Sequence, residues 1–271
     1  QCSSIEMGVV RGGSWINLLE DLNVLERSSI NIDSHRFTVG ARLLRERPPV
    51  TQDPPPRTPE WLTLESGEID PDQAGPMPAV MIEAFQIMKH EITLGQYRAC
   101  VAAEVCAPPN GDCTMNSNLW GNWTFTPENR EEHPITGVTQ QELEIYARWV
   151  GQGARLPTIS EWLYTVTQRA PNLFIQSTNC QQGNTSSCMG RGMTMGICLL
   201  DELSDTQRPC DLLGNVAEFV INEEMGGHQY IGGSWSQRID TIRPFTSQTL
   251  SEGRCLRSVG GRLVRPVGAD D

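Results

Sequence analysis

A short frame of residues occurs twice in the chain, 220 positions apart. Residues 12–15 and residues 232–235 both read Gly-Gly-Ser-Trp. In each copy, 25 positions after the Trp, a Gly opens a second motif: G-A-R-L-L-R at 40–45 and G-G-R-L-V-R at 260–265. The residues between the two motifs are not similar, which is typical of a variable loop on a constant frame. We therefore expect the chain to begin inside one copy of a unit and to end with a second copy of the same part.

Six prolines between residues 46 and 59 mark a boundary between the two copies. Proline fixes φ and has no N–H to donate, so this stretch is expected to be extended and to lie outside any sheet. The sequence therefore predicts three parts. They are a first part at residues 1–48, a linker at 49–59, and a main domain at 60–271.

Alternating apolar residues predict two strands within residues 60–92. Threonine and serine favour the N-cap position of helices, where the side-chain oxygen accepts a hydrogen bond from the first turn. Three helices are expected to start at such caps. The candidate caps are Thr93, Thr139, and either Thr158 or Ser160.

The nine cysteines favour disulfide bonds over zinc. Structural zinc sites use close pairs such as C-x-x-C, whereas no two cysteines here are fewer than six positions apart. The candidates for disulfides are Cys100, Cys106, Cys113, Cys180, Cys188, Cys198 and Cys210. Because nine is odd, at least one thiol is left free or bonded to another chain, and Cys2 and Cys255 are the candidates. Disulfides persist in oxidising compartments, so we expect a secreted, periplasmic or cell-surface protein.

The charge balance excludes one class of partner. The chain has 33 acidic and 21 basic residues, a formal net charge of −12. Such a chain repels the phosphates of nucleic acid, so we expect no nucleic-acid partner. No uncharged apolar run approaches the roughly 18–20 residues of a membrane helix, so we expect no membrane span.

Six segments in one order carry a family resemblance. They read E-I-T-L-G-Q-Y-R-A-C (91–100), H-P-I-T-G-V-T (133–139), A-R-L-P-T-I-S-E-W (154–162), L-L-G-N-V-A-E-F (212–219), I-G-G-S-W (231–235) and G-G-R-L-V-R (260–265). Together they resemble the formylglycine-generating enzyme family, also called the sulfatase-modifying-factor family.

This resemblance covers residues 60–266 and implies an α+β fold of the C-type-lectin-like kind. Such a domain is rich in loops, with short antiparallel strands and two or three helices. Residues 8–47 resemble the end of a further family domain. We expect the front half of that domain, or a neighbouring chain, to contact residues 8–47.

The resemblance also bears on catalysis. The family's oxidase binds copper through two cysteines that follow the Gly-Gly-Ser-aromatic motif. Counted from Trp235, these positions are Ile242 and Ser247, and in the first copy they are Leu22 and Arg27. Because paired thiolates select Cu(I), we expect no copper and a non-catalytic binding or structural module with a protein or glycan ligand. The alternatives are a copper-dependent oxidase acting on sulfatase cysteines through other ligands, and a variable-loop lectin-fold protein that binds ligands through the 25-residue interval.

One metal site is implied by the resemblance. In the family, the segment around G-N-V-A-E commonly surrounds a calcium ion. The implied ligands are the side chains of Asp211 and Glu218 and the carbonyl groups of Gly214 and Val216. Calcium prefers such mixed carboxylate and carbonyl shells. The alternative is that both acids are solvated loop residues.

Several aromatic and histidine side chains have expected places. We expect Trp149, Trp162 and Trp235 in the core, because large aromatic side chains contribute most to packing. His133 is expected to be structural, near a helix start, and His90 to be exposed. The four histidines are widely scattered and do not predict an iron or zinc site.

Overall fold

The computed structural model describes residues 7–11, 27–31, 58–69, 79–109, 130–170, 183–188, 193–200, 208–223, 227–242 and 247–269. The chain divides into two compact units, Gln1–Asp53 and Pro54–Asp271. The division falls within the proline-rich stretch of residues 46–59.

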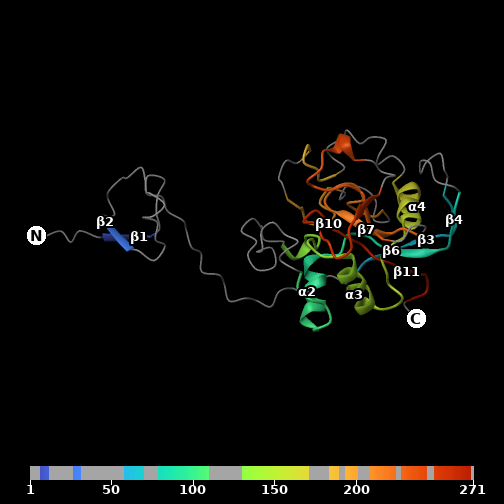
Figure 1. The fold of residues 1–271 in the computed structure, drawn as a ribbon, viewed down its shortest axis with the longest axis horizontal. Helices are drawn as coiled ribbons and strands as arrows, with labels where there is room; N and C mark the ends of the chain where they lie inside the picture. Colours follow the sequence, from blue (N-terminus) through green and yellow to red (C-terminus); the bar gives the residue numbers. More distant parts are fainter. Residues whose placement is uncertain are drawn as a thin grey trace, which may run out of the picture. The chain divides into compact units, whose positions relative to one another are not determined.

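Short strands form three sheets in the described part of the larger unit (Figure 1). The first has the order β10-β7-β8-β9, with bounds Val259–Gly260, Ala217–Ile221, His228–Ile231 and Gln248–Leu250. The second has the order β11-β6-β3, with bounds Val264–Pro266, Phe85–Met88 and Trp61–Leu64. The third pairs β4 (Gly67–Glu68) with β5 (Met81–Ile82). All pairs are antiparallel except β10 with β7.

Three α-helices begin at threonine caps. They are α2 (Leu94–Ala102), α3 (Gln140–Val150) and α4 (Ile159–Arg169), after Thr93, Thr139 and Thr158. In each, the Thr side chain accepts from the backbone N–H three residues later. The Gln or Glu at that later position accepts in turn from the Thr N–H. Two 3-10 turns, η3 (Arg130–Glu132) and η4 (Ile239–Thr241), are also present. The expected α+β fold class is therefore confirmed. No helix among the described residues has the length and apolar character needed to cross a membrane.

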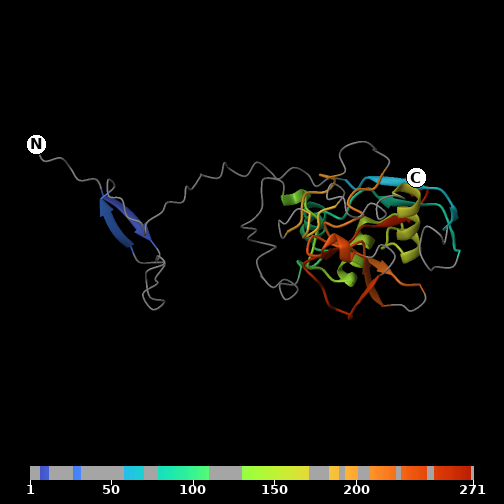
Figure 2. The same cartoon turned by 90° about the horizontal axis from the view of Figure 1, so that it is seen from above.

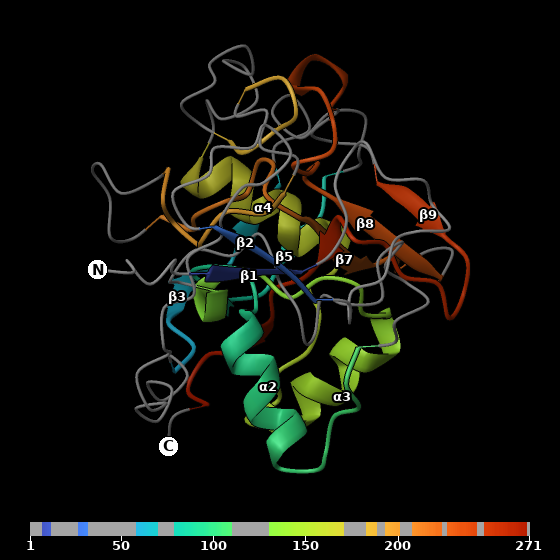
Figure 3. The same cartoon turned by 90° about the vertical axis from the view of Figure 1, so that its left-hand side faces the viewer.

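Strand β7 separates two apolar clusters. In Figures 1 and 3, α2 and α3 lie together on one side of β7, and α4 lies on the other. Phe219 is buried with the side chains of α2 and α3, whereas Val220 is buried with Trp162 of α4. Successive side chains of a strand point to opposite faces, so β7 contributes to both clusters. This places Glu218, on the α4 face, in the interior of the unit.

The N-terminal unit contains a hairpin of β1 (Met7–Arg11) and β2 (Arg27–Asn31), the two blue arrows in Figure 2. Its register matches that of β8 and β9. Adding 220 to Gly8↔Ile30, Val9↔Ser29 and Val10↔Ser28 gives the observed pairs His228↔Leu250, Gln229↔Thr249 and Tyr230↔Gln248. The repeat in the sequence is therefore also a repeat of backbone pairing.

Two expectations about single side chains are wrong. Trp149 is 36% exposed at the end of α3, whereas Trp162 and Trp235 are buried as expected. His90 is only 2% exposed, and its Nδ1 lies 2.7 Å from the carbonyl oxygen of Glu91. His90 lies in a bend after the end of β6 at Met88, so the strand alternation no longer applies to it.

Candidate functional site

A buried ion pair joins β7 to the segment after β10. Arg262 Nη2 donates to Glu218 Oε1 at 2.6 Å, and Arg262 Nε lies 2.8 Å from both carboxylate oxygens. The side chains are 0% and 1% exposed. Residue 260, two positions before Arg262, has room only for glycine, because a Cβ there would lie 2.4 Å from the Ile135 carbonyl oxygen. The Gly-Gly-Arg motif thus brings a guanidinium against β7.

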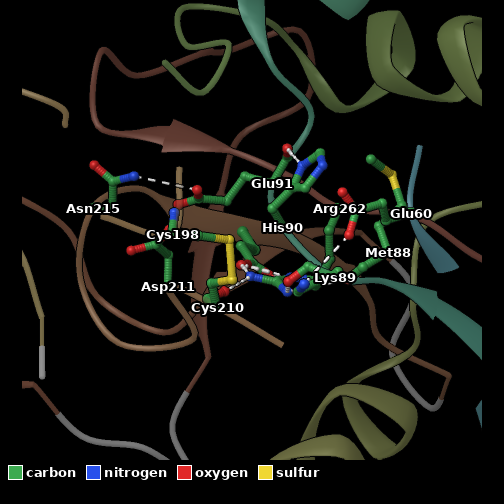
Figure 4. Close-up of a disulfide and its surroundings, with 11 residues drawn as sticks. Glu60, Met88, Lys89, His90, Glu91, Cys198, Cys210, Asp211, Asn215 and Arg262 are labelled. Carbon is green, nitrogen blue, oxygen red and sulfur yellow. Dashed lines mark hydrogen bonds and ion pairs between the residues drawn. A yellow bond between two sulfur atoms is a disulfide. The ribbon is translucent and has the colours of Figure 1, made fainter. Parts of the chain in front are cut away.

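Arg262 also donates to carbonyl groups of two further segments (Figure 4). Nη1 donates to the carbonyl oxygens of Met88 and Lys89, each at 3.2 Å. Nη2 also donates to the carbonyl oxygen of Cys210 at 2.8 Å. A guanidinium presents five donors in a rigid plane, and here they meet a carboxylate and three carbonyl groups. Arg262 therefore connects β6, β7 and the loop at Cys210.

Trp162 supplies another donor to the same carboxylate. Its Nε1 donates to Glu218 Oε2 at 2.8 Å, so α4 is bonded to β7 through its indole. Trp162 is a core aromatic, as its sequence context predicts, and it also meets a charged group. A buried indole N–H usually has such a partner.

A second buried carboxylate, Glu91, lies between β6 and α2. Its Oε2 accepts from Asn215 Nδ2 at 3.2 Å and its Oε1 from the Val216 N–H at 3.4 Å. Burial raises the pKa of Glu91 well above its ordinary value, and the nearby Asp211 carboxylate raises this pKa further. Glu91 is therefore held in its neutral form more readily than an exposed glutamate.

The turn before β7 has left-handed backbone at two polar residues. Asp211 has φ +55° and Asn215 has φ +51°, a conformation that Asn and Asp adopt more readily than most residues. Asn215 Oδ1 accepts from Asn184 Nδ2 at 3.2 Å and from the Met195 N–H at 2.9 Å. Side-chain hydrogen bonds thus hold the turn that delivers Glu218.

The family of the chain is identified by comparing its sequence with models of protein families. Residues 48–188 match the FGE-sulfatase family, described as the sulfatase-modifying factor enzyme 1-like domain. That match spans more than half of the chain. The chain belongs to this family. A search of curated proteins finds no match.

Several solved structures have a similar fold. PvdO from Pseudomonas aeruginosa is 18% identical with a TM-score of 0.60, and the match covers 77% of this chain and 95% of PvdO. CarF is 18% identical with a TM-score of 0.55, covering 78% of this chain and 99% of CarF. Treponema denticola variable protein 1 is 15% identical with a TM-score of 0.53, covering 75% and 94%. At these identities the likeness concerns the fold alone.

The calcium ligands that the family resemblance implies are Asp211, Gly214, Val216 and Glu218. The geometry of Glu218 does not fit this role. Its carboxylate already accepts from Arg262 and from Trp162, and the guanidinium would repel a dication at the same oxygens. Asp211 Oδ2 accepts from the Cys198 N–H at 2.6 Å. No three His, Cys, Asp or Glu side chains of the described residues form a metal-binding group.

The two positions that carry copper-binding cysteines in the family's oxidase have other roles here. Ile242 is buried in the apolar cluster of α4, and its Cδ1 would lie 2.5 Å from a Cβ placed on Gly233. Ser247 Oγ donates to Gln229 Oε1 at 2.5 Å. Neither side chain offers a soft ligand to copper. The first-copy positions, Leu22 and the side chain of Arg27, lie outside the described part.

Two disulfides are described, Cys100–Cys106 and Cys198–Cys210. Cys188 is also disulfide-bonded. Cys255 is disulfide-bonded as well, although the sequence made it a candidate for a thiol that is free or bonded to another chain. The other cysteines, Cys2, Cys113 and Cys180, lie outside the described residues. The Cys198–Cys210 bond lies beside Asp211 and Arg262 (Figure 4).

Sequence reasoning identified Glu218 but missed two of its neighbours. Arg262 was seen only as part of a repeated motif, and Glu91 only as part of a family segment. A usable signal was present at Arg262, which stands between Gly261 and Leu263, whereas Glu91 follows Lys89 and His90 and carries no such signal. Charged residues in such settings are buried only when they are paired or hydrogen-bonded.

Proposed function

We propose that the chain is a non-catalytic binding module of the sulfatase-modifying-factor family. The observation that carries the proposal is the pair Ile242 and Ser247, which stand where the family's oxidase has copper-binding cysteines. All six described cysteines are disulfide-bonded, so none of them offers a thiolate instead. The alternative, a copper-dependent oxidase acting on sulfatase cysteines, would need a different ligand set.

Copper uptake tests this proposal directly. Purified protein is titrated with Cu(I) in competition with a coloured copper chelator. We expect no competition from the protein, and the same result for Ser247→Ala. Stoichiometric copper uptake by the protein, lowered by substitution of any described residue, would overturn the proposal.

An extracytoplasmic location is part of the proposal. The disulfides support it, because cystines of this kind persist in oxidising compartments. Protein taken from its natural source can be alkylated before and after reduction and then weighed. We expect the cysteines of both described disulfides to be alkylated only after reduction. Alkylation of these four thiols without reduction would place the protein in a reducing compartment.

Calcium binding at Asp211, Gly214, Val216 and Glu218 stays a prediction of the resemblance. Such binding requires Glu218 to leave Arg262 or to share its carboxylate between a guanidinium and a dication. A domain stabilised by calcium melts lower in chelator, because a ligand of the folded state has been removed. The Arg262 contacts instead predict equal melting temperatures with calcium and with excess chelator. A lower melting temperature in chelator, lost in Asp211→Ala, would establish the calcium site.

The proposal also includes a partner for the N-terminal hairpin. In the larger unit β8 pairs with β9 on one edge and with β7 on the other. The first copy has the matching hairpin β1–β2, and Arg42 stands at the position of Arg262. A strand of β7 type, from the front half of a family domain or from a neighbouring chain, would complete the hairpin and supply a carboxylate for Arg42.

A second candidate function is ligand binding through a variable loop. The two copies keep the same hairpin register while residues 16–26 and 236–246 differ in sequence. One solved structure of similar fold is named a variable protein, from Treponema denticola. Sequencing this gene from several isolates tests this candidate. Substitutions concentrated in residues 236–259 would support it, and substitutions spread evenly along the chain would contradict it.

A further inference from the structure

Trp235 lies at the start of the 25-residue interval between the two repeated motifs, and Arg257 lies near its end. Both ends of the interval are hydrogen-bonded to residues 215–217. Trp235 donates its backbone N–H to the Asn215 carbonyl oxygen at 2.9 Å, and the Ala217 N–H donates to the Ser258 carbonyl oxygen at 3.0 Å. The Arg257 guanidinium carbon lies 5.3 Å from the centroid of the Trp235 ring. The pair therefore sits where the interval begins and ends.

The indole N–H of Trp235 is a buried donor without an acceptor in the described part of the chain. Its side chain is 8% exposed, and Nε1 is buried with no hydrogen-bond partner among the described residues. Trp162 offers the comparison, because its Nε1 donates to Glu218 at 2.8 Å. A buried donor left unsatisfied costs about 1–3 kcal/mol, so such a group calls for an acceptor.

Arg257 stacks on Trp235 without a carboxylate partner in the described part of the chain. Four described arginines pair with carboxylates, in the pairs Arg98–Glu131, Arg155–Glu161, Arg238–Asp240 and Arg262–Glu218. Arg257 is exposed and has no carboxylate within ion-pair distance in the described part of the chain. An arginine stacked on an aromatic ring keeps its in-plane N–H groups available to an acceptor beside the ring.

We propose that Trp235 and Arg257 form a binding site for an oxyanion group, a carboxylate or a sulfate, of the ligand. The group would accept from the indole N–H and from the guanidinium together, and charge-assisted bonds of this kind are the stronger ones. Arg257 is exposed, so its side chain can move with the ligand. The hydroxyl pair Ser234–Ser236, 3.0 Å apart and flanking Trp235, offers further donors. The proposal rests on the proposed binding function and names its ligand class.

In the test, the NMR resonance of the Trp235 indole N–H reports anion binding. The chain has seven tryptophans, and Trp235→Phe identifies the Trp235 indole resonance in a nitrogen–proton correlation spectrum. Sodium acetate and sodium sulfate are titrated separately against the full chain, with ionic strength held constant by chloride. We expect a saturable shift of the Trp235 resonance with at least one of the two anions. The response to acetate against sulfate tells which oxyanion is preferred.

Two arginine variants form a matched pair. Arg257→Gln should weaken the anion affinity roughly tenfold, the equivalent of one lost charge-assisted hydrogen bond. Arg238→Gln should leave the affinity unchanged, because Arg238 is exposed and already paired with Asp240. A Trp235 resonance that does not move, or that moves equally in Arg257→Gln, would overturn the site. Either result leaves the non-catalytic proposal standing, because that proposal rests on Ile242 and Ser247.

Discussion

At the scale of single residues, the Glu218–Arg262 pair shows how this domain holds charge in its interior. Moving two charges out of water is costly, and their attraction repays that cost only when geometry and additional hydrogen bonds are good. Both conditions hold here, because Arg262 also donates to three carbonyl groups and Glu218 also accepts from Trp162. Removing either charge alone would leave the other one buried and unpaired.

Replacing Glu218 by Gln should therefore be strongly destabilising. Glutamine keeps an acceptor for Trp162 and removes the charge that compensates Arg262. We expect the free energy of unfolding in urea to fall by about 3–5 kcal/mol, as for other broken buried pairs.

The exposed pair Arg238–Asp240 provides the control. Its side chains are 67% and 54% exposed, so solvent screens their attraction. Arg238→Gln should leave the urea midpoint unchanged. If Glu218→Gln were as mild as Arg238→Gln, the ion pair would not be the buried connection described here.

At the scale of elements, local chemistry was predictable and tertiary contacts were not. The helix starts at Thr93 and Thr139 follow from a Thr and the residue three positions later, an interaction within one turn. The burial of His90, the exposure of Trp149 and the network at Glu91 depend on segments far apart in the chain. Alternation and composition carry no information about such contacts, so only part of the site could be predicted.

His133 gives a prediction about pH at this scale. Its Nδ1 lies 2.9 Å from Thr194 Oγ1, which joins the segment before α3 to residues 193–200. Burial lowers the pKa of His133 below its ordinary value of 6.5. The unfolded chain therefore binds a proton at His133 at a pH where the folded domain does not. Neutral His133 therefore costs the fold nothing above pH 6.5, and the free energy of unfolding decreases as the pH falls below 6.5.

This pH dependence of stability can be checked by urea unfolding of the wild type and of His133→Gln between neutral and mildly acidic pH. Glutamine cannot titrate, so the stability of the wild type relative to the variant should decrease as the pH falls. A difference between the two proteins that stays constant with pH would contradict the assignment.

At the scale of the whole molecule, the chain divides into two units, and each unit contains a hairpin of the same register. The larger unit has its own sheets, helices and apolar clusters, whereas the described part of the smaller unit is a single hairpin. An isolated two-stranded hairpin is marginally stable at best in water. The larger unit should therefore fold without the smaller one, and the smaller one should need a partner.

A chain of residues 57–271 should remain folded and monomeric, with the melting temperature of the full chain. Size-exclusion chromatography and thermal unfolding of the two chains measure this side by side. Limited proteolysis of the full chain should cut first within residues 1–59. Unfolding of the 57–271 chain would mean that the two units share one core and that the boundary at the prolines is wrong.

The central claim is that a chain of the sulfatase-modifying-factor family has kept the fold without the family's oxidase chemistry. The most direct measurement is conversion of a Cys-x-Pro-x-Arg peptide, incubated with the copper-treated full chain and followed by mass spectrometry. An active family oxidase in the same buffer serves as the positive control. We predict no formylglycine above the blank without protein, because Ile242 and Ser247 supply no thiolate. Copper-dependent conversion that increases with protein concentration would contradict the account.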